Sequence, residues 1–155
     1  SGNGGFDDVD SGKTTLLSPV FDCSGLDEVL LTYWRWYTNN IGDNGDNDKW
    51  IVSVSNNNTN WVDVENTSVS NTSWAKKRFL LSDYIDLNST VRFRFIAEDL
   101  LYDGDNGSGG SLVEAGLDDF SLEFLSDGSG ITGDVNSDES IDVLDVVLLV
   151  NSILQ

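Results

Sequence analysis

The chain has 155 residues, with 27 acidic against 8 basic side chains, no histidine and a single cysteine. A formal net charge of −19 repels phosphate backbones and anionic membranes, so we expect no nucleic-acid partner. The absence of histidine excludes Ser-His-Asp triads and imidazole zinc sites. No run of about 18 apolar residues occurs, so no membrane span is predicted, and the many carboxylates make Ca²⁺ the expected cofactor.

Residues 14–124 have the pattern of β-strands. Short runs rich in Trp, Tyr, Phe, Val and Ile alternate with turns rich in Asn, Asp, Gly and Ser. Strands are expected at residues 28–38, 49–55, 61–65, 74–81, 91–97 and 117–125. In 91–97 every second residue, from Val91 to Ala97, is apolar, which predicts one face in the core and one toward water. We therefore predict an all-β domain over residues 1–125, an antiparallel β-sandwich of the jelly-roll kind.

The first of these strands has aromatic side chains in both phases of its alternation. Trp34 and Trp36 occupy one phase, and the other phase contains Tyr33, Arg35 and Tyr37. If the tryptophans face the core, the second set forms an exposed row on which a sugar ring can stack and form hydrogen bonds. The alternative is ordinary cross-strand aromatic packing in a sheet that is covered on both faces. The row is a candidate ligand-binding site.

Acidic residues near both ends of the predicted sandwich form a second candidate site. One phase of the run 117–125 contains Asp118, Phe120, Leu122 and Phe124. This pattern predicts that the Asp118 carboxylate points toward the core, where it needs a cation or several donors. Asp8 and Asp10 could complete an oxygen cage around Ca²⁺ with Asp118. The alternative is that backbone N–H groups or an arginine satisfy Asp118.

After a Ser- and Gly-rich linker at residues 126–132, the stretch GDVNSDESIDVLD (133–145) has the spacing of a calcium loop. Such a loop places oxygen ligands at positions 1, 3, 5, 7, 9 and 12. These positions are Asp134, Asn136, Asp138, the main-chain carbonyl of Ser140, Asp142 and Asp145. Glu139 departs from the pattern, because glycine is usual at that turn. We predict Ca²⁺ binding within a second unit, 133–155; the alternative is a solvated acidic turn.

The segment 143–154 that follows is almost entirely apolar. Because strict alternation is missing, a short helix beginning after Asp142 is predicted. A helix that is apolar on all sides must be buried, so the segment is a candidate docking surface. The side chains concerned are Val143, Leu144, Val147, Leu148, Val150 and Leu154. The many β-branched residues leave an added strand as the alternative.

The stretch GDVNSDESIDVLDVVLLVNSIL resembles one half of a type I dockerin repeat. The resemblance implies Ca²⁺ binding by Asp134, Asn136, Asp138, Asp142 and Asp145, followed by an aliphatic helix. Dockerins usually carry two such repeats packed together, and they bind cohesin domains of scaffold proteins. A single repeat is present in this sequence.

The larger domain is similar to the MAM-like jelly-roll modules of secreted bacterial metallopeptidases and adhesins. The likeness rests on the stretches DVDSGKTTLLSPVFDCSG, LTYWRWYTNN and VEAGLDDFSLEF, and it covers most of residues 8–124. It implies a non-catalytic module that holds structural Ca²⁺ and serves in adhesion or in binding glycans or proteins.

Together these observations predict a secreted or cell-surface, non-catalytic, calcium-binding module with a glycan or an extracellular protein as its ligand. One alternative is a structural subunit of an extracellular assembly, in which the segment 143–154 docks onto a neighbouring copy. A second alternative is a carboxylate-based hydrolase. The second is disfavoured because the acidic residues lie in loops with the spacing of metal ligands.

Overall fold

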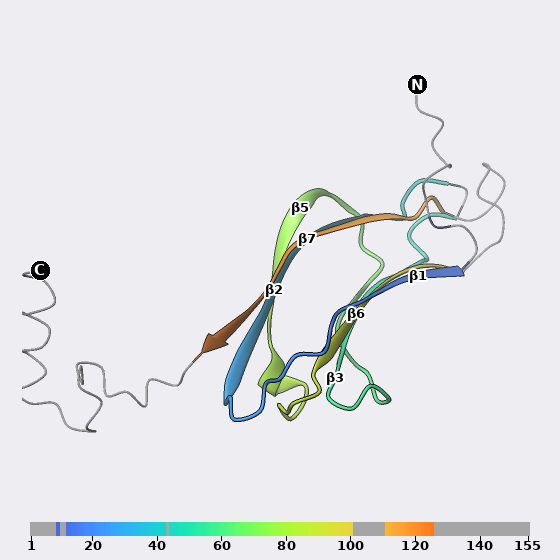
Figure 1. Cartoon of the computed structure of the whole chain (residues 1–155). Helices are drawn as coiled ribbons and strands as arrows, with labels where there is room; N and C mark the ends of the chain where they lie inside the picture. The colour runs from blue at the N-terminus through green and yellow to red at the C-terminus, as the bar shows by residue number, and fades with distance from the viewer. Residues whose placement is uncertain (1–8, 10–11, 43, 101–110, 126–155) are drawn as a thin grey trace, which may run out of the picture. The chain divides into compact units, whose positions relative to one another are not determined.

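The chain folds into two antiparallel β-sheets in the computed structural model, which describes residue 9 and residues 12–42, 44–100 and 111–125. The strands are β1 (Gly12–Leu17), β2 (Glu28–Thr38), β3 (Trp50–Ser55), β4 (Val62–Thr67), β5 (Asn71–Leu80), β6 (Arg92–Asp99) and β7 (Glu114–Leu125). A 3₁₀ turn, η1 (Leu81–Asp83), follows β5. One sheet has the order β1-β6-β3-β4 and the other β5-β2-β7. Figure 1 shows the two sheets, with β1, β6 and β3 in one and β5, β2 and β7 in the other.

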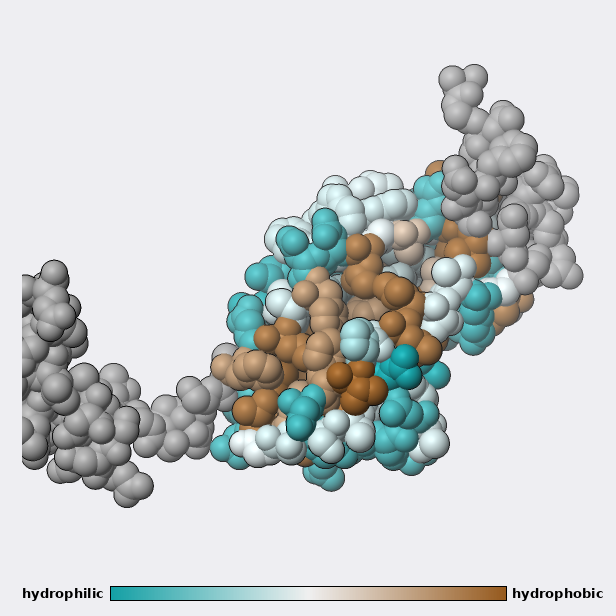
Figure 2. Space-filling model, viewed as in Figure 1, coloured by the Kyte–Doolittle hydropathy of each residue, from teal (hydrophilic) through white to brown (hydrophobic). Residues whose placement is uncertain are grey.

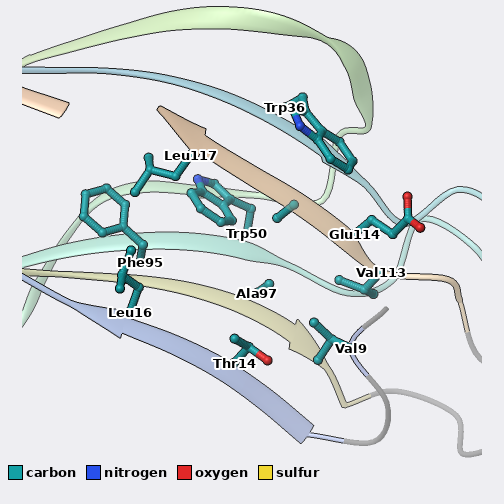
Figure 3. A pocket seen from close by; sticks show the side chains of 11 residues that line it. Val9, Thr14, Leu16, Trp36, Trp50, Phe95, Ala97, Val113, Glu114 and Leu117 are labelled. Carbon is teal, nitrogen blue, oxygen red and sulfur yellow. The ribbon is translucent and has the colours of Figure 1, made fainter. Parts of the chain in front are cut away.

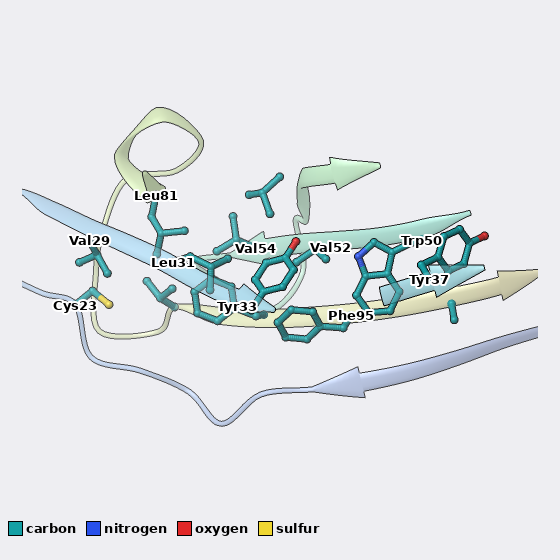
Figure 4. Packing of buried hydrophobic residues seen from close by; sticks show 14 of the residues in the cluster. Cys23, Val29, Leu31, Tyr33, Tyr37, Trp50, Val52, Val54, Leu81 and Phe95 are labelled. Carbon is teal, nitrogen blue, oxygen red and sulfur yellow. The ribbon is translucent and has the colours of Figure 1, made fainter. Parts of the chain in front are cut away.

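The core lies between the two sheets and consists of alternate side chains from their facing strands (Figure 4). From β2 these are Val29, Leu31, Tyr33 and Tyr37; from β3, Trp50, Val52 and Val54; from β6, Phe93, Phe95 and Ala97. Strand alternation explains why these residues form the core, because every second side chain of a strand points to the same face. Cys23 is fully buried among them as a small apolar side chain.

Most of the strand pattern predicted from the sequence is confirmed. Strand β2 has the predicted bounds, and each of β3 to β7 overlaps its predicted run. The apolar phase from Val91 to Ala97 is buried, while Arg92 and Arg94 in the opposite phase are half-buried. Strand β1 is an element that the sequence reading did not list. The all-β, β-sandwich-like architecture is therefore established, and the jelly-roll assignment stays a prediction.

The contacts divide the chain into two compact units, Ser1–Phe124 and Leu125–Gln155. Beyond Leu125 the second unit lies outside the described residues, and so do the predicted calcium loop and apolar segment. In the part of the chain that is described, no helix is long and apolar enough to cross a membrane.

Candidate functional site

The outer face of the β5-β2-β7 sheet carries three of the five tryptophans of the chain. The odd-numbered residues of β2 from Val29 to Tyr37 fill the core, so Trp34 and Trp36 point away from it. On β5, Trp74 is 48% exposed, and Lys76 and Arg78 in the same phase are also exposed. We call this surface the tryptophan face; its residues are Trp34, Trp36, Trp74, Lys76 and Arg78.

The geometry of the tryptophan face is set by a local irregularity of β5. Arg35 pairs with Ala75 and Tyr37 pairs with Asn71, so three residues of β5 stand opposite Trp36 alone. This extra length bends the strand locally and brings the ring of Trp74 edge-on to that of Trp36. The two ring centroids are 6.5 Å apart, with planes at 90°.

Strand β7 provides the space that the indole ring of Trp36 occupies. Gly116 lies beneath the ring: a Cβ atom at this position would stand 2.1 Å from Trp36 Nε1. No side chain can be accommodated there without displacing the ring, so glycine at this position allows the indole of Trp36 to lie over β7. The tryptophan face therefore presents three packed aromatic rings. Trp34 and Trp36 are half-buried, and Trp74 is half-exposed.

The prediction of an exposed row formed by Tyr33, Arg35 and Tyr37 is wrong. Their exposed fractions are 0%, 3% and 0%, because this phase of β2 faces the opposite sheet. The tryptophans take the outer phase instead, so the alternative of aromatic packing inside the sandwich describes this row. Tyr33 packs edge-on against Phe95, with centroids 5.4 Å apart.

Arg35 is buried because a carboxylate of the opposite sheet meets it. The pairing of β3 with β4 shifts between Val52 and Ser53, which lets both Val64 and Glu65 reach the interior. Glu65 Oε1 then lies 2.5 Å from Arg35 Nη2. Arg35 and Glu65 thus form an ion pair across the core, with side chains only 4% and 9% exposed.

Further donors contact the carboxylate of Glu65. Its carboxylate accepts hydrogen bonds from the Tyr33 hydroxyl at 2.5 Å and from Trp50 Nε1 at 3.2 Å, and Lys77 Nζ lies 3.1 Å away. Burial alone would raise the pKa of Glu65, but the hydrogen bonds from Arg35 and Tyr33 and the charges of Arg35 and Lys77 outweigh it, so the pKa is below its ordinary value. The Glu65 carboxylate therefore links the two sheets through its ion pair with Arg35. Because its pKa is lowered, it is a weak base and is unsuited to accept a proton from a substrate.

Asp48 forms a second buried polar cluster at the end of β6. Its carboxylate accepts hydrogen bonds from the backbone N–H of Leu100 at 2.8 Å and from the Ser111 hydroxyl at 2.7 Å. Its main-chain carbonyl accepts one from Asn39 Nδ2 at 2.6 Å. These contacts tie the segments around residues 39, 100 and 111 together, which is a structural role.

The prediction that Asp118 points into the core is also wrong. Asp119 adopts a left-handed backbone conformation, with φ of 50°, and its N–H donates to Asp118 Oδ1 at 2.8 Å. This bulge shifts the alternation of β7 by one residue, so Leu117 and then Phe120 pack toward the core while Asp118 is exposed. In the described residues, Asp118 therefore accepts a local backbone hydrogen bond.

The remaining predicted metal ligands cannot be placed. Asp8 and Asp10 lie outside the described residues, as do Asp134, Asn136, Asp138, Ser140, Asp142 and Asp145. Within residues 12–42, 44–100 and 111–125, no three Asp, Glu or Cys side chains gather in a way that could hold a metal ion. Calcium binding stays a prediction.

An open apolar groove runs between β1 and β7, the edge strands of the two sheets. It comprises two adjoining hollows of about 590 and 600 Å³ that share Leu16, Phe95 and Leu117. Figure 3 shows Thr14 and Leu16 of β1 on one side of the first hollow and Leu117 of β7 on the other. The second hollow adds Pro19, Phe21, Phe120, Leu122 and Phe124. In Figure 2 a patch of apolar residues crosses the middle of this face, with hydrophilic residues around it.

No protein-family model matches this chain, and no curated protein is significantly similar to it. The side chains themselves are therefore the basis for a function. The tryptophan face was detectable in the sequence, since Trp74, Lys76 and Arg78 share one phase of β5. It was missed because the tryptophans of β2 were assigned to the core.

Proposed function

We propose that this chain is a secreted or cell-surface, non-catalytic binding module that binds a carbohydrate on the tryptophan face. In this proposal the sandwich is of the jelly-roll kind, and the loop 134–145 holds Ca²⁺ through the ligands predicted above. The single observation that carries the proposal is the placement of Trp34, Trp36 and Trp74 on an outer sheet face.

Three large aromatic rings reach the surface on one sheet face: Trp74 is 48% exposed, and Trp34 and Trp36 are half-buried beside it. Their outward placement leaves apolar area exposed, and such patches rimmed by polar residues mark interaction sites. Indole rings suit carbohydrate ligands because the C–H faces of a pyranose ring pack on an aromatic surface while the sugar hydroxyls stay hydrated. Trp36 already packs over the backbone at Gly116 and against the ring of Trp74, so little ordering of this side chain is needed on binding.

The proposal is tested by measuring binding of the full chain to a panel of soluble polysaccharides by affinity electrophoresis and calorimetry. We expect Trp74→Ala to weaken binding about tenfold, the loss of one buried aromatic contact of about 1.4 kcal/mol. Trp61→Ala is the matched control, because Trp61 is a half-buried tryptophan that directly precedes β4 of the other sheet and lies beneath Arg94. Full binding by a folded Trp34→Ala/Trp74→Ala double variant would refute the proposal, and hydrolysis of the panel would refute its non-catalytic part.

The open groove favours a second candidate function, that of a structural subunit in an extracellular assembly. A groove between two edge strands offers apolar hollows, and in the part of the chain that the structure describes β1 and β7 each pair with a named strand on one side only, which is the geometry that accepts an added strand from another chain. The proposed occupant is the apolar segment 143–154 of a neighbouring copy. Its β-branched residues suit an extended conformation.

Sedimentation of the full chain over a range of concentrations tests this second candidate. Self-association that is lost in Val147→Asp and kept in Asn151→Asp, a polar position of the same segment, is the expected result. A monomer at every concentration would rule out the assembly function.

A further inference from the structure

We propose that the carbohydrate bound on the tryptophan face is anionic, carrying carboxylate or sulfate groups that pair with Lys76 and Arg78. This inference rests on the proposed function and adds the chemical class of the ligand. It follows from where the unpaired positive charges of this acidic chain are located.

Most basic side chains of the chain already have partners. Lys13 pairs with Glu98 at 2.6 Å, Lys77 and Arg35 pair with Glu65, Arg94 stacks on Trp61, and Arg92 Nε donates to the Ser18 carbonyl at 2.7 Å. Among the described residues, neither Lys76 nor Arg78 forms an ion pair or a side-chain hydrogen bond. Lys49 is the remaining cation of this kind, and it precedes β3 in the other sheet. The tryptophan face therefore has two neighbouring cations that are available to a ligand.

The two cations lie directly beside the aromatic rings. Lys76 stands opposite Trp34 in the β2–β5 register, and Arg78 stands opposite Thr32. Alternate residues of a strand are about 7 Å apart, so the two charges follow the edge of the aromatic surface with a spacing of similar size to a sugar unit. A ring stacked on Trp34 thus brings an acidic substituent within reach of both side chains. The guanidinium group of Arg78 can bind a carboxylate or a sulfate through two parallel hydrogen bonds.

The opposite edge of the same face carries the opposite charge. On β7, Glu114 and Asp118 share the phase of Gly116 and are exposed. Positive charge on β5, aromatic rings on β2 and negative charge on β7 give the face a polarity across its strands. An anionic chain is therefore directed to lie with its charged groups over β5. Repulsion by the rest of the acidic surface is screened beyond about 8 Å at physiological ionic strength.

The experiment compares pairs of polymers that differ in charge. The full chain is titrated with polygalacturonate and its methyl-esterified form, and with a sulfated galactan and its unsulfated counterpart. We expect the charged member of one pair to bind about tenfold more tightly, which is one charge-assisted contact of about 1.4 kcal/mol. Which pair responds distinguishes carboxylate from sulfate. The preference is expected to weaken as salt is raised and to disappear in Lys76→Gln/Arg78→Gln, whereas Lys49→Gln leaves it unchanged.

Two negative results can be told apart. Equal binding of charged and neutral polymers, still weakened about tenfold by Trp74→Ala, would overturn the inference and leave the proposed function standing. Binding to none of the polymers would overturn both. Retention of the charge preference in the Lys76→Gln/Arg78→Gln variant would overturn the assignment to these two side chains.

Discussion

The indole ring of Trp36 occupies the space that any side chain at Gly116 would need. A Cβ atom built on Gly116 lies 2.1 Å from Nε1 and 2.8 Å from Cδ1 of Trp36, far inside van der Waals contact. The two residues belong to neighbouring strands, so the packing of one tryptophan depends on the backbone of the next strand. Sheet stability and the shape of the tryptophan face are therefore coupled at this contact.

Gly116→Ala is expected to lower the free energy of unfolding by about 2 kcal/mol, because overpacking displaces the ring or the strand. Displacement of Trp36 should also change the intrinsic fluorescence and weaken carbohydrate binding. Gly12→Ala is the matched control, since a Cβ at Gly12 in β1 meets no atom within 4 Å. Urea unfolding monitored by circular dichroism measures both variants. Equal stability of the two would contradict the contact.

Glu65→Gln is expected to lower the free energy of unfolding by about 3 kcal/mol, because it leaves the buried Arg35 guanidinium without its counter-charge. Lys77→Gln serves as the comparison. The Lys77 side chain is 32% exposed and lies at the edge of the same cluster, so its removal should cost less than about 1 kcal/mol. Chemical denaturation at neutral pH provides the two values, and similar losses for both would contradict a central role for Arg35.

The same carboxylate makes stability depend on pH in a predictable direction. The pKa of Glu65 in the folded protein lies below its ordinary value of 4.5. As the pH falls, Glu65 is therefore protonated first in the unfolded chain. The contribution of its carboxylate to the free energy of unfolding is complete above the ordinary pKa of 4.5 and is lost as the pH falls through the lower pKa of the folded state. We expect the difference in unfolding free energy between wild type and Glu65→Gln to shrink as the pH is lowered through this range. A constant difference at all pH values would show that ionisation of Glu65 is not responsible.

The faces of β2 show where sequence reasoning stops. The limits of the strand were predictable from the run of β-branched and aromatic residues, but both of its phases are aromatic, so alternation alone does not decide which is inside. Burial of Arg35 decides it, and that burial depends on Glu65, a residue of another sheet that only the fold brings into reach. Pairings between distant segments of this kind leave no local pattern in the sequence.

Strand β7 shows a second limit. A strict two-residue period from Asp118 to Phe124 predicts a buried carboxylate, yet a single residue with positive φ, Asp119, shifts the phase. Aspartate adopts this conformation more readily than most side chains, so the adjacent Asp118 and Asp119 between apolar residues were a usable signal for a bulge. Leu117 and Phe120 both pack toward the core although they belong to opposite phases of a regular strand. Only a break in the alternation between them places both on the core side.

Thr32 offers a test in which stability should rise. Its hydroxyl is buried on β2 and has no hydrogen-bond partner among the described residues. Thr32→Val keeps the shape and removes the unsatisfied group, so we expect the free energy of unfolding to increase by about 1 kcal/mol. Thr32→Ser keeps the hydroxyl, loses a methyl group and should destabilise. Destabilisation by valine in urea titrations would mean that the hydroxyl has a partner.

If the predicted loop holds Ca²⁺, its removal is expected to lower the melting temperature of the segment 133–155. A metal held only by the folded loop stabilises it by mass action, by about 2.7 kcal/mol at a hundredfold excess over Kd. Calorimetry of the full chain with Ca²⁺ and with EDTA measures the shift. Asp134→Asn/Asp145→Asn should abolish the shift, since both end positions of the predicted loop lose a charged ligand. Asp127→Asn, in the linker, is the control and should behave as wild type. Identical melting curves with and without Ca²⁺, together with no heat of Ca²⁺ binding, would exclude the loop as a calcium site.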